Sequence, residues 1–184
     1  MGGYRVMLEG SKVYLTSIEK DDLEQLRNWR NQEDYRKHFR EYREISKDMQ
    51  MAWYESKVLK DNSTIMFSIR SKETNELLGC CGLCYINWVN RNADLSLYIG
   101  YENSYIDDKG FAEEACRLMF DYGFKELALN KIWTEIYEFD VKKLNLYDKL
   151  GFNKDGFLRE QYYHNGKWWG SYMLSLLCRE WLKN

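Results

Sequence analysis

The sequence has no proline, only two histidines, and no hydrophobic run near the length that a membrane span requires. A helix that crosses a bilayer needs roughly 20 consecutive apolar residues, so no contact with a membrane is expected. The first residues lack the apolar core of a signal peptide, and Val6 stands where a myristoylation signal requires Ser or Thr. These absences favour a cytoplasmic protein.

Linkers and repeats are missing as well. No Gly/Ser-rich or low-complexity segment interrupts the 184 residues, and no stretch repeats another. A chain of this length is long enough to enclose a substantial hydrophobic core. The sequence therefore predicts one domain over residues 1–184.

The cysteines are too few and too irregularly placed for a disulfide framework. Their number is odd, and they are Cys80, Cys81, Cys84, Cys116 and Cys178. Cys81 and Cys84 have the spacing of zinc ligands, but His38 and His164 lie far away in sequence and form no second pair. We expect reduced thiols in the core and no metal site.

A surplus of either charge is also absent. The 27 basic and 29 acidic residues leave a formal net charge of -2. This balance provides no overall attraction to nucleic acid, so nucleic acid is not an expected partner.

Hydrophobic periodicity predicts alternating strands and helices. Asn165-Gly166 predicts a hairpin turn near the C-terminal end, and Gly151 predicts a left-handed helix cap. The expected strands are 12–16, 65–70, 77–86, 93–99, 131–137, 156–163 and 167–177, and the expected helices are 21–30, 46–60, 110–127 and 141–150. The order β-α-α-β-β-β-α-β-α-β-β predicts an α/β or α+β domain around one mixed sheet.

The helix expected to begin at Gly110 follows a polar loop, Gly100 to Lys109. A glycine at a helix start lets the main chain approach a ligand closely, and the free amides of the first turn can hold an anion. The pattern fits a pyrophosphate site. An ordinary turn would also explain Gly110, because many helices begin with glycine.

Two further residues are candidates for catalysis. Tyr147 lies within a helix that ends at Gly151, and Glu135 lies in a strand between Trp133 and Tyr137. A carboxylate between two aromatic side chains is partly desolvated, which favours the role of a general base. Taken singly, Tyr147 is also consistent with core packing, and Glu135 with a solvated acid at a sheet edge.

Together these features resemble the GNAT superfamily of N-acetyltransferases. The resemblance covers residues 8–177 and rests on the segment Arg91-Asn92-Ala93-Asp94-Leu95, the run KGFAEEA from Lys109 to Ala115, and a Tyr-x-x-x-Gly-Phe motif followed by a hairpin. It is nearest to the branch of ribosomal-protein alanine N-acetyltransferases and spermidine N-acetyltransferases. The resemblance implies a mixed, mostly antiparallel sheet flanked by helices. It also implies an enzyme that moves an acetyl group from acetyl-CoA to a primary amine by direct attack.

By this resemblance, one strand and one helix start should hold coenzyme A. The cofactor-binding residues are then Leu97, Tyr98, Ile99, Lys109, Gly110, Phe111, Ala112 and Asp140. Amides of the strand should polarise the thioester carbonyl, and amides of the helix should hold the pyrophosphate. Tyr147 matches the family's general acid, and Glu135 lies twelve residues before it, as the general base does in the alanine N-acetyltransferase pattern. Asp94 is a second candidate for the base or for a contact to the acceptor.

Some positions depart from the family pattern. The phosphate loop usually opens with Gln or Arg and a small residue, where this chain has Asp107 and Asp108, and Asp140 stands where Asn is common. Carboxylates beside a pyrophosphate are repulsive unless they turn outward or bind a cation. We therefore expect acetyl-CoA to bind through amides, but more weakly than in the family at large.

The acceptor is less well defined by the sequence. Its pocket is expected to involve Trp29, Arg40, Trp53 and Asp94. Residues 35–44 interleave cations with aromatic side chains, which fits either a solvated surface of mixed charge or a wall for an anionic acceptor such as a nucleotide-linked amino sugar. A protein N-terminus stays open as the acceptor. A polyamine is less favoured because this segment has no excess of carboxylates.

A catalytically silent acyl-CoA-binding sensor or scaffold is the alternative from another class. The acidic phosphate loop and Asp140 support it, whereas the pairing of Glu135 with Tyr147 favours an enzyme. Seven tryptophans and fifteen tyrosines exceed what one core buries easily. Some of them, Trp168-Trp169 above all, are expected to line the acceptor cleft or a homodimer contact.

Overall fold

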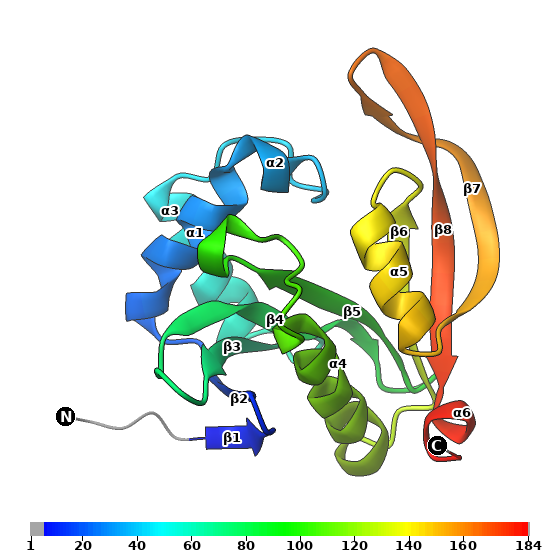
Figure 1. Cartoon of the computed structure of the whole chain (residues 1–184), viewed down its shortest axis with the longest axis horizontal. Helices are drawn as coiled ribbons and strands as arrows, with labels where there is room; N and C mark the ends of the chain where they lie inside the picture. Colours follow the sequence, from blue (N-terminus) through cyan, green and yellow to red (C-terminus); the bar gives the residue numbers. More distant parts are fainter. Residues whose placement is uncertain (1–5, 184) are drawn as a thin grey trace.

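The computed structural model describes residues 6–183, whose strands form one eight-stranded sheet in the order β1-β2-β3-β4-β5-β6-β8-β7 (Figure 1). Neighbouring strands pair antiparallel except β5 and β6, which are parallel. The strands are β1 (Val6–Glu9), β2 (Val13–Ser17), β3 (Ile65–Ser71), β4 (Leu77–Asn87), β5 (Asn92–Ile99), β6 (Lys131–Tyr137), β7 (Asn153–His164) and β8 (Lys167–Leu177). The helices are α1 (Leu23–Asn31), α2 (Glu33–Arg36), α3 (Lys47–Trp53), α4 (Phe111–Asp121), α5 (Val141–Lys149) and α6 (Cys178–Trp181). This architecture confirms the mixed, mostly antiparallel sheet flanked by helices.

Caps and turns that can be recognised in the sequence lie at the ends of the helices and strands for which they were predicted. Ser46 caps α3 by accepting a hydrogen bond from the Met49 amide at 3.1 Å. Gly151 has a φ of 86°, and the Asn165-Gly166 turn has φ values of 51° and 73°, as a left-handed cap and a tight hairpin require. β1, α2 and α6 were not expected, because four residues are too few to show a period.

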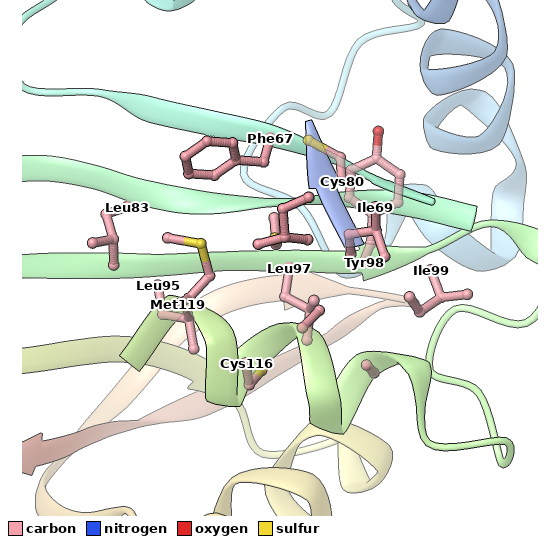
Figure 2. Close-up of a cluster of buried hydrophobic side chains, with 14 of the residues drawn as sticks. Phe67, Ile69, Cys80, Leu83, Leu95, Leu97, Tyr98, Ile99, Cys116 and Met119 are labelled. Carbon is pink, nitrogen blue, oxygen red and sulfur yellow. The ribbon is translucent and has the colours of Figure 1, made fainter. Parts of the chain in front are cut away.

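Helices cover both faces of the sheet (Figure 1). Leu97 of β5 points toward α4, where Cys116 and Met119 are buried, whereas Tyr98 points the other way (Figure 2). The Tyr98 hydroxyl donates to the Leu26 carbonyl of α1 at 3.4 Å. Because side chains alternate along a strand, even-numbered positions of β5 face α1 and odd-numbered positions face α4.

The cysteines lie mainly in this core. All five are free; Cys80, Cys81 and Cys116 are buried, and Cys84 and Cys178 are partly exposed. Burial raises the pKa of the Cys81 thiol well above its usual value. These observations confirm unbridged core thiols. Within residues 6–183, no helix has the length and apolarity that crossing a membrane requires.

The hairpin of β7 and β8 extends beyond the other strands (Figure 1). Trp168 is 55% exposed near its tip and contacts the ring of Tyr163, with centroids 5.1 Å apart. Trp169 turns inward, and its ring meets that of Phe139 edge-on at 5.3 Å. The hairpin thus leaves aromatic surface exposed, and a homodimer contact there stays a prediction.

Candidate active site

β5 and β6 pair only at their first residues and then separate. Their parallel ladder ends where Asp94 faces Trp133, while β5 continues to pair with β4 and β6 with β8. A pocket of about 380 Å³ opens at this fork, and its walls include Asp94, Glu135 and Arg40. The two candidate bases therefore meet in one cavity.

Asp94 and Glu135 share one guanidinium. Arg40 Nη2 lies 3.2 Å from Glu135 Oε2 and 3.8 Å from Asp94 Oδ2. Glu135 Oε1 also accepts a hydrogen bond from Ser171 Oγ at 2.6 Å, so both of its carboxylate oxygens are engaged. Asp94 makes the longer contact and is only 9% exposed. Burial raises the pKa of Asp94 to about 6, although the charges of Arg40 and Lys143 oppose the shift.

Tyr147 lies in α5 and is fully buried. Its ring stacks on Phe152 with centroids 5.1 Å apart. Its hydroxyl has no hydrogen-bond partner within residues 6–183. Burial raises the pKa of Tyr147 well above its usual value, and the nearby charges of Asp140 and Asp94 add to this, so the hydroxyl stays protonated. A buried donor without a partner is rare and suits a group that hydrogen-bonds a ligand.

The main chain of Leu97 faces the gap between β5 and β6. The N–H and C=O of one strand residue point to the same side, and the side alternates from residue to residue. The N–H and C=O of Leu97 point away from β4. The Leu95 carbonyl accepts from Thr134 Oγ1 at 3.4 Å, and the Ile99 amide donates to the Tyr105 carbonyl at 3.0 Å. Leu97 has no ladder partner on that side. Of the three expected strand positions, Leu97 alone directs its amide into the gap. The Tyr98 amide points toward β4, and the Ile99 amide is already bonded to the Tyr105 carbonyl.

Asp140 caps α5 and ties several segments together. Its Oδ1 accepts from the Lys143 amide at 3.1 Å, and its Oδ2 accepts from the Tyr105 hydroxyl at 3.3 Å. His38 Nδ1 lies 3.2 Å from the same Oδ2. Burial alone would raise the pKa of Asp140, but His38 and the Lys143 charge outweigh it and the pKa is lowered. Asp140 thus anchors the segment before α3 to the start of α5.

The phosphate loop is arranged differently from expectation. Asp107 turns inward and caps α4, accepting from the Phe111 amide at 2.8 Å and from the Ala112 amide at 2.7 Å. Gly110 adopts a φ of 87° at the helix start, as a close approach of the main chain requires. An aspartate shortly before a helix is a recognised cap signal, and it could have revealed this contact in the sequence.

A second pocket of about 340 Å³ lies in front of this helix start. Its cations are Lys142 and Lys149, both from α5. Lys109 turns away from it, since its Nζ contacts Glu102 at 2.8 Å and its carbonyl accepts from Lys12 Nζ at 2.7 Å. The expected phosphate site therefore has the two α5 lysines on one wall. On the other wall are the first amides of α4, which are hydrogen-bonded to the Asp107 carboxylate.

Trp29 requires a correction. It was expected to line the acceptor pocket, but it is 6% exposed and packs against Gly100, where an added Cβ would come within 1.8 Å of its ring. Its neighbour Arg30 lines the pocket instead, together with the expected Trp53. Arg30 directly follows Trp29 in α1. In a helix of mixed charge, the sequence does not show which cation faces a pocket.

Comparisons with known proteins agree with this geometry. The model of the acetyltransferase (GNAT) domain family matches residues 12–153. The chain is 38% identical over 114 residues to the uncharacterised N-acetyltransferase p20 of Bacillus licheniformis, which spans 62% of each chain. It is 29% identical over 158 residues to the spermidine N(1)-acetyltransferase of Vibrio cholerae, covering 86% of this chain and 88% of that one.

A solved structure shares the fold over nearly the whole chain. It is the spermidine N-acetyltransferase of Vibrio cholerae in complex with CoA and spermine, with a TM-score of 0.85 and 28% identity, covering 94% of this chain and 99% of that one. The fork between parallel strands, the buried and unpartnered Tyr147 and the family match all point to the same conclusion. The chain belongs to the GNAT acetyltransferase family, whose members transfer an acetyl group from acetyl-CoA.

Proposed function

We propose that this protein acetylates the primary amine of a small molecule, with Asp94 as the general base and Tyr147 as the general acid. The observation that supports this most is the buried Tyr147 hydroxyl without a partner, close enough to Asp94 for the charge of that carboxylate, whose pKa is raised, to act on it. Acetyl-CoA supplies the acetyl thioester. The chain's own groups would bind the amine, hydrogen-bond the thioester oxygen, accept one proton from the amine and donate another to the departing thiolate.

The proton of the amine is best accepted by Asp94. A base works best when its pKa lies near the working pH, and a pKa of about 6 meets this condition. Glu135 is the base that the family pattern suggested, but Ser171 and Arg40 hold its two oxygens. We assign Glu135 to orienting Arg40 and to making the fork negative, so that an ammonium group is attracted.

The opposite side of the fork serves the leaving group. The Leu97 amide faces the gap and would donate to the thioester oxygen as negative charge develops there. The Tyr147 hydroxyl would give its proton to the departing sulfur. Because the hydroxyl makes no internal hydrogen bond, it need not break one to do so. A silent sensor would have no use for this pairing of base and acid.

The base assignment predicts a pH profile. For the wild type, kcat/KM should fall as the pH drops below about 6, because protonated Asp94 cannot accept a proton. Asp94→Asn should lower kcat/KM by roughly 10²- to 10⁴-fold and remove this acidic limb. Thiol release from acetyl-CoA, followed with a panel of amines between pH 5 and 9, measures both effects.

Glu135→Gln is the matched control for the base. It should reduce kcat/KM less than Asp94→Asn and should keep the acidic limb, because the base is intact. If Glu135→Gln abolishes the limb and Asp94→Asn keeps it, the roles of the two carboxylates are reversed. Thiol release that fails with every amine in the panel would contradict the proposed function itself.

The cap at α4 predicts that coenzyme binding competes with Asp107. Asp107→Ala should tighten acetyl-CoA binding by about tenfold, because it frees two amides and removes a negative charge near the diphosphate. The same variant should lower Tm slightly, since a helix cap is lost. Calorimetry and thermal unfolding measure the two effects.

Asp108→Ala is the control for the cap. The Asp108 carboxylate makes no hydrogen bond within the described part of the chain, so this variant removes a charge and no cap. It should tighten acetyl-CoA binding less than Asp107→Ala and leave Tm unchanged. Weaker binding by Asp107→Ala would mean that the carboxylate shapes the loop for the coenzyme.

A further inference from the structure

Arg30 is a cation without a counter-ion on the wall of the fork pocket. It lies on α1, and its guanidinium stacks on Phe39 with the carbon 4.5 Å from the ring centre. Its Nε is buried and has no hydrogen-bond partner in residues 6–183, and none of the ion pairs in that span includes it. A half-buried guanidinium with a buried, unpartnered Nε is well suited to bind an anion.

The carboxylates of the pocket, in contrast, each lie near at least one cation. Arg43 contacts the Glu41 carboxylate at 2.7 and 2.8 Å, and its hydrogen bonds lower the Glu41 pKa with a smaller contribution from Arg30. Asp140 is held by His38 and Lys143. Two carboxylates at the fork share the single Arg40 cation. The Lys143 charge reaches both Asp94 and Asp140, so the fork is the more negative end of the pocket. Arg30, at the other end, belongs to none of the ion pairs of the described residues.

A second donor lies on the same wall. Gln50 of α3 lines the pocket, is 5% exposed, and makes no side-chain hydrogen bond within residues 6–183. Its side-chain amide can therefore donate a hydrogen bond to an oxygen of a ligand in the pocket. Arg30 and Gln50 together present hydrogen-bond donors to the pocket, away from the carboxylates at the fork.

We propose that the acceptor is an amine that also carries an anionic oxygen group, a carboxylate or a phosphate, and that Arg30 binds this group. The inference rests on the acetyl transfer proposed above and names the class of its acceptor. The ammonium end meets the excess negative charge at the fork, and the anionic end meets the Arg30 guanidinium, which binds such groups in a bidentate manner. A polyamine would instead bring its further cations against Arg30, and the pocket has no second unmatched carboxylate to receive them.

Matched amines test the proposal. Glucosamine 6-phosphate is compared with glucosamine, and β-alanine with propylamine, so that each pair differs by one phosphate or one carboxylate; spermidine is the polycation. Binding is measured by calorimetry and turnover by thiol release with acetyl-CoA. We expect the member of at least one pair that carries the phosphate or carboxylate to bind about tenfold more tightly than the partner that lacks it, and spermidine to bind more weakly than that member. The pair with the larger ratio distinguishes a phosphate from a carboxylate.

Arg30→Gln should bring the binding ratio of that pair to about one, whereas Lys47→Gln, which removes an equally positive charge on exposed α3 surface outside the pocket, should keep it. Arg30→Lys retains the charge and should keep part of the binding ratio. A ratio that remains in this variant would show that substitution at this position leaves the site folded. The proposal is overturned if spermidine binds or reacts as well as the best anionic amine, if neither pair shows a ratio above about two, or if Lys47→Gln abolishes the ratio as Arg30→Gln does. Equal turnover of the amines with and without the anionic group would leave the acetyltransferase proposal standing while this inference fails.

Discussion

Replacing Tyr147 with Phe is expected to lower kcat by about 10²- to 10⁴-fold, the usual contribution of a positioned general acid. The departing thiolate would lose its proton donor, while binding of acetyl-CoA would change little because the ring remains. The Phe ring keeps the stacking contact with Phe152. Steady-state kinetics of thiol release with the best acceptor, with calorimetric binding of acetyl-CoA, separates the two effects.

A comparison of two buried tyrosines controls this experiment. Tyr35 is 1% exposed, and its hydroxyl, like that of Tyr147, has no partner within residues 6–183. Tyr35 lies on α2, however, and only Tyr147 is close enough to Asp94 for its charge to act on the hydroxyl. Removing either unpartnered hydroxyl should leave Tm unchanged or raise it slightly, since no hydrogen bond is lost. Only Tyr147→Phe should lower kcat. A kcat that Tyr147→Phe leaves within about threefold of the wild type would show that Tyr147 has a packing role.

Asp22→Ala is expected to cost about 3–5 kcal/mol of the free energy of unfolding, because it breaks a buried ion pair from one side. Asp22 Oδ1 contacts Arg70 Nη2 at 2.5 Å, and the two side chains are 5% and 4% exposed. Asp22 Oδ2 accepts from Ser68 Oγ at 2.7 Å. The pair joins the start of α1 to β3, and α1 carries Arg30 into the pocket. Urea denaturation measures the loss, provided that unfolding is two-state.

The neighbouring acid provides the control for this prediction. Asp21 lies on the surface of the same turn and belongs to none of the ion pairs in the described chain. Asp21→Ala should change the free energy of unfolding by no more than about 0.5 kcal/mol. If Asp22→Ala costs less than about 1 kcal/mol, the Arg70 charge is stabilised well enough by its other surroundings.

Much of the backbone could be predicted because its signals are local. The alternating run from Lys131 to Tyr137 became β6 with the bounds expected for it, and Asn165-Gly166 formed the turn between β7 and β8. A turn or cap depends on the backbone preferences of a few adjacent residues, so the sequence contains its cause. The resemblance to acetyltransferases rested on such segments and on their order, and the family match confirms it.

The electrostatic assignments could not be reached in this way. Asp94 and Glu135 look alike in the sequence, as carboxylates on neighbouring strands. Burial, which only the tertiary structure decides, raises the pKa of Asp94 to about 6 although the Arg40 charge opposes the shift. Asp107 looked repulsive to a phosphate, yet it caps α4. Trp29 was expected at the acceptor pocket, but the turn of α1 buries it and directs its neighbour Arg30 into the pocket instead.

The sequence by itself determined the order of the longer strands and helices, the turn at Asn165-Gly166 and the family of the chain, because each depends on neighbouring residues. Tertiary structure alone decided which carboxylate is desolvated, which amides are already bonded and which cation lacks a partner. The physical reason is distance along the chain: Arg40 meets Glu135 across 95 residues, and Glu114 accepts hydrogen bonds from the main chain of Lys12 and Val13 across 102 and 101 residues. Charges and hydrogen bonds act over a few ångströms in space, whichever part of the chain supplies them.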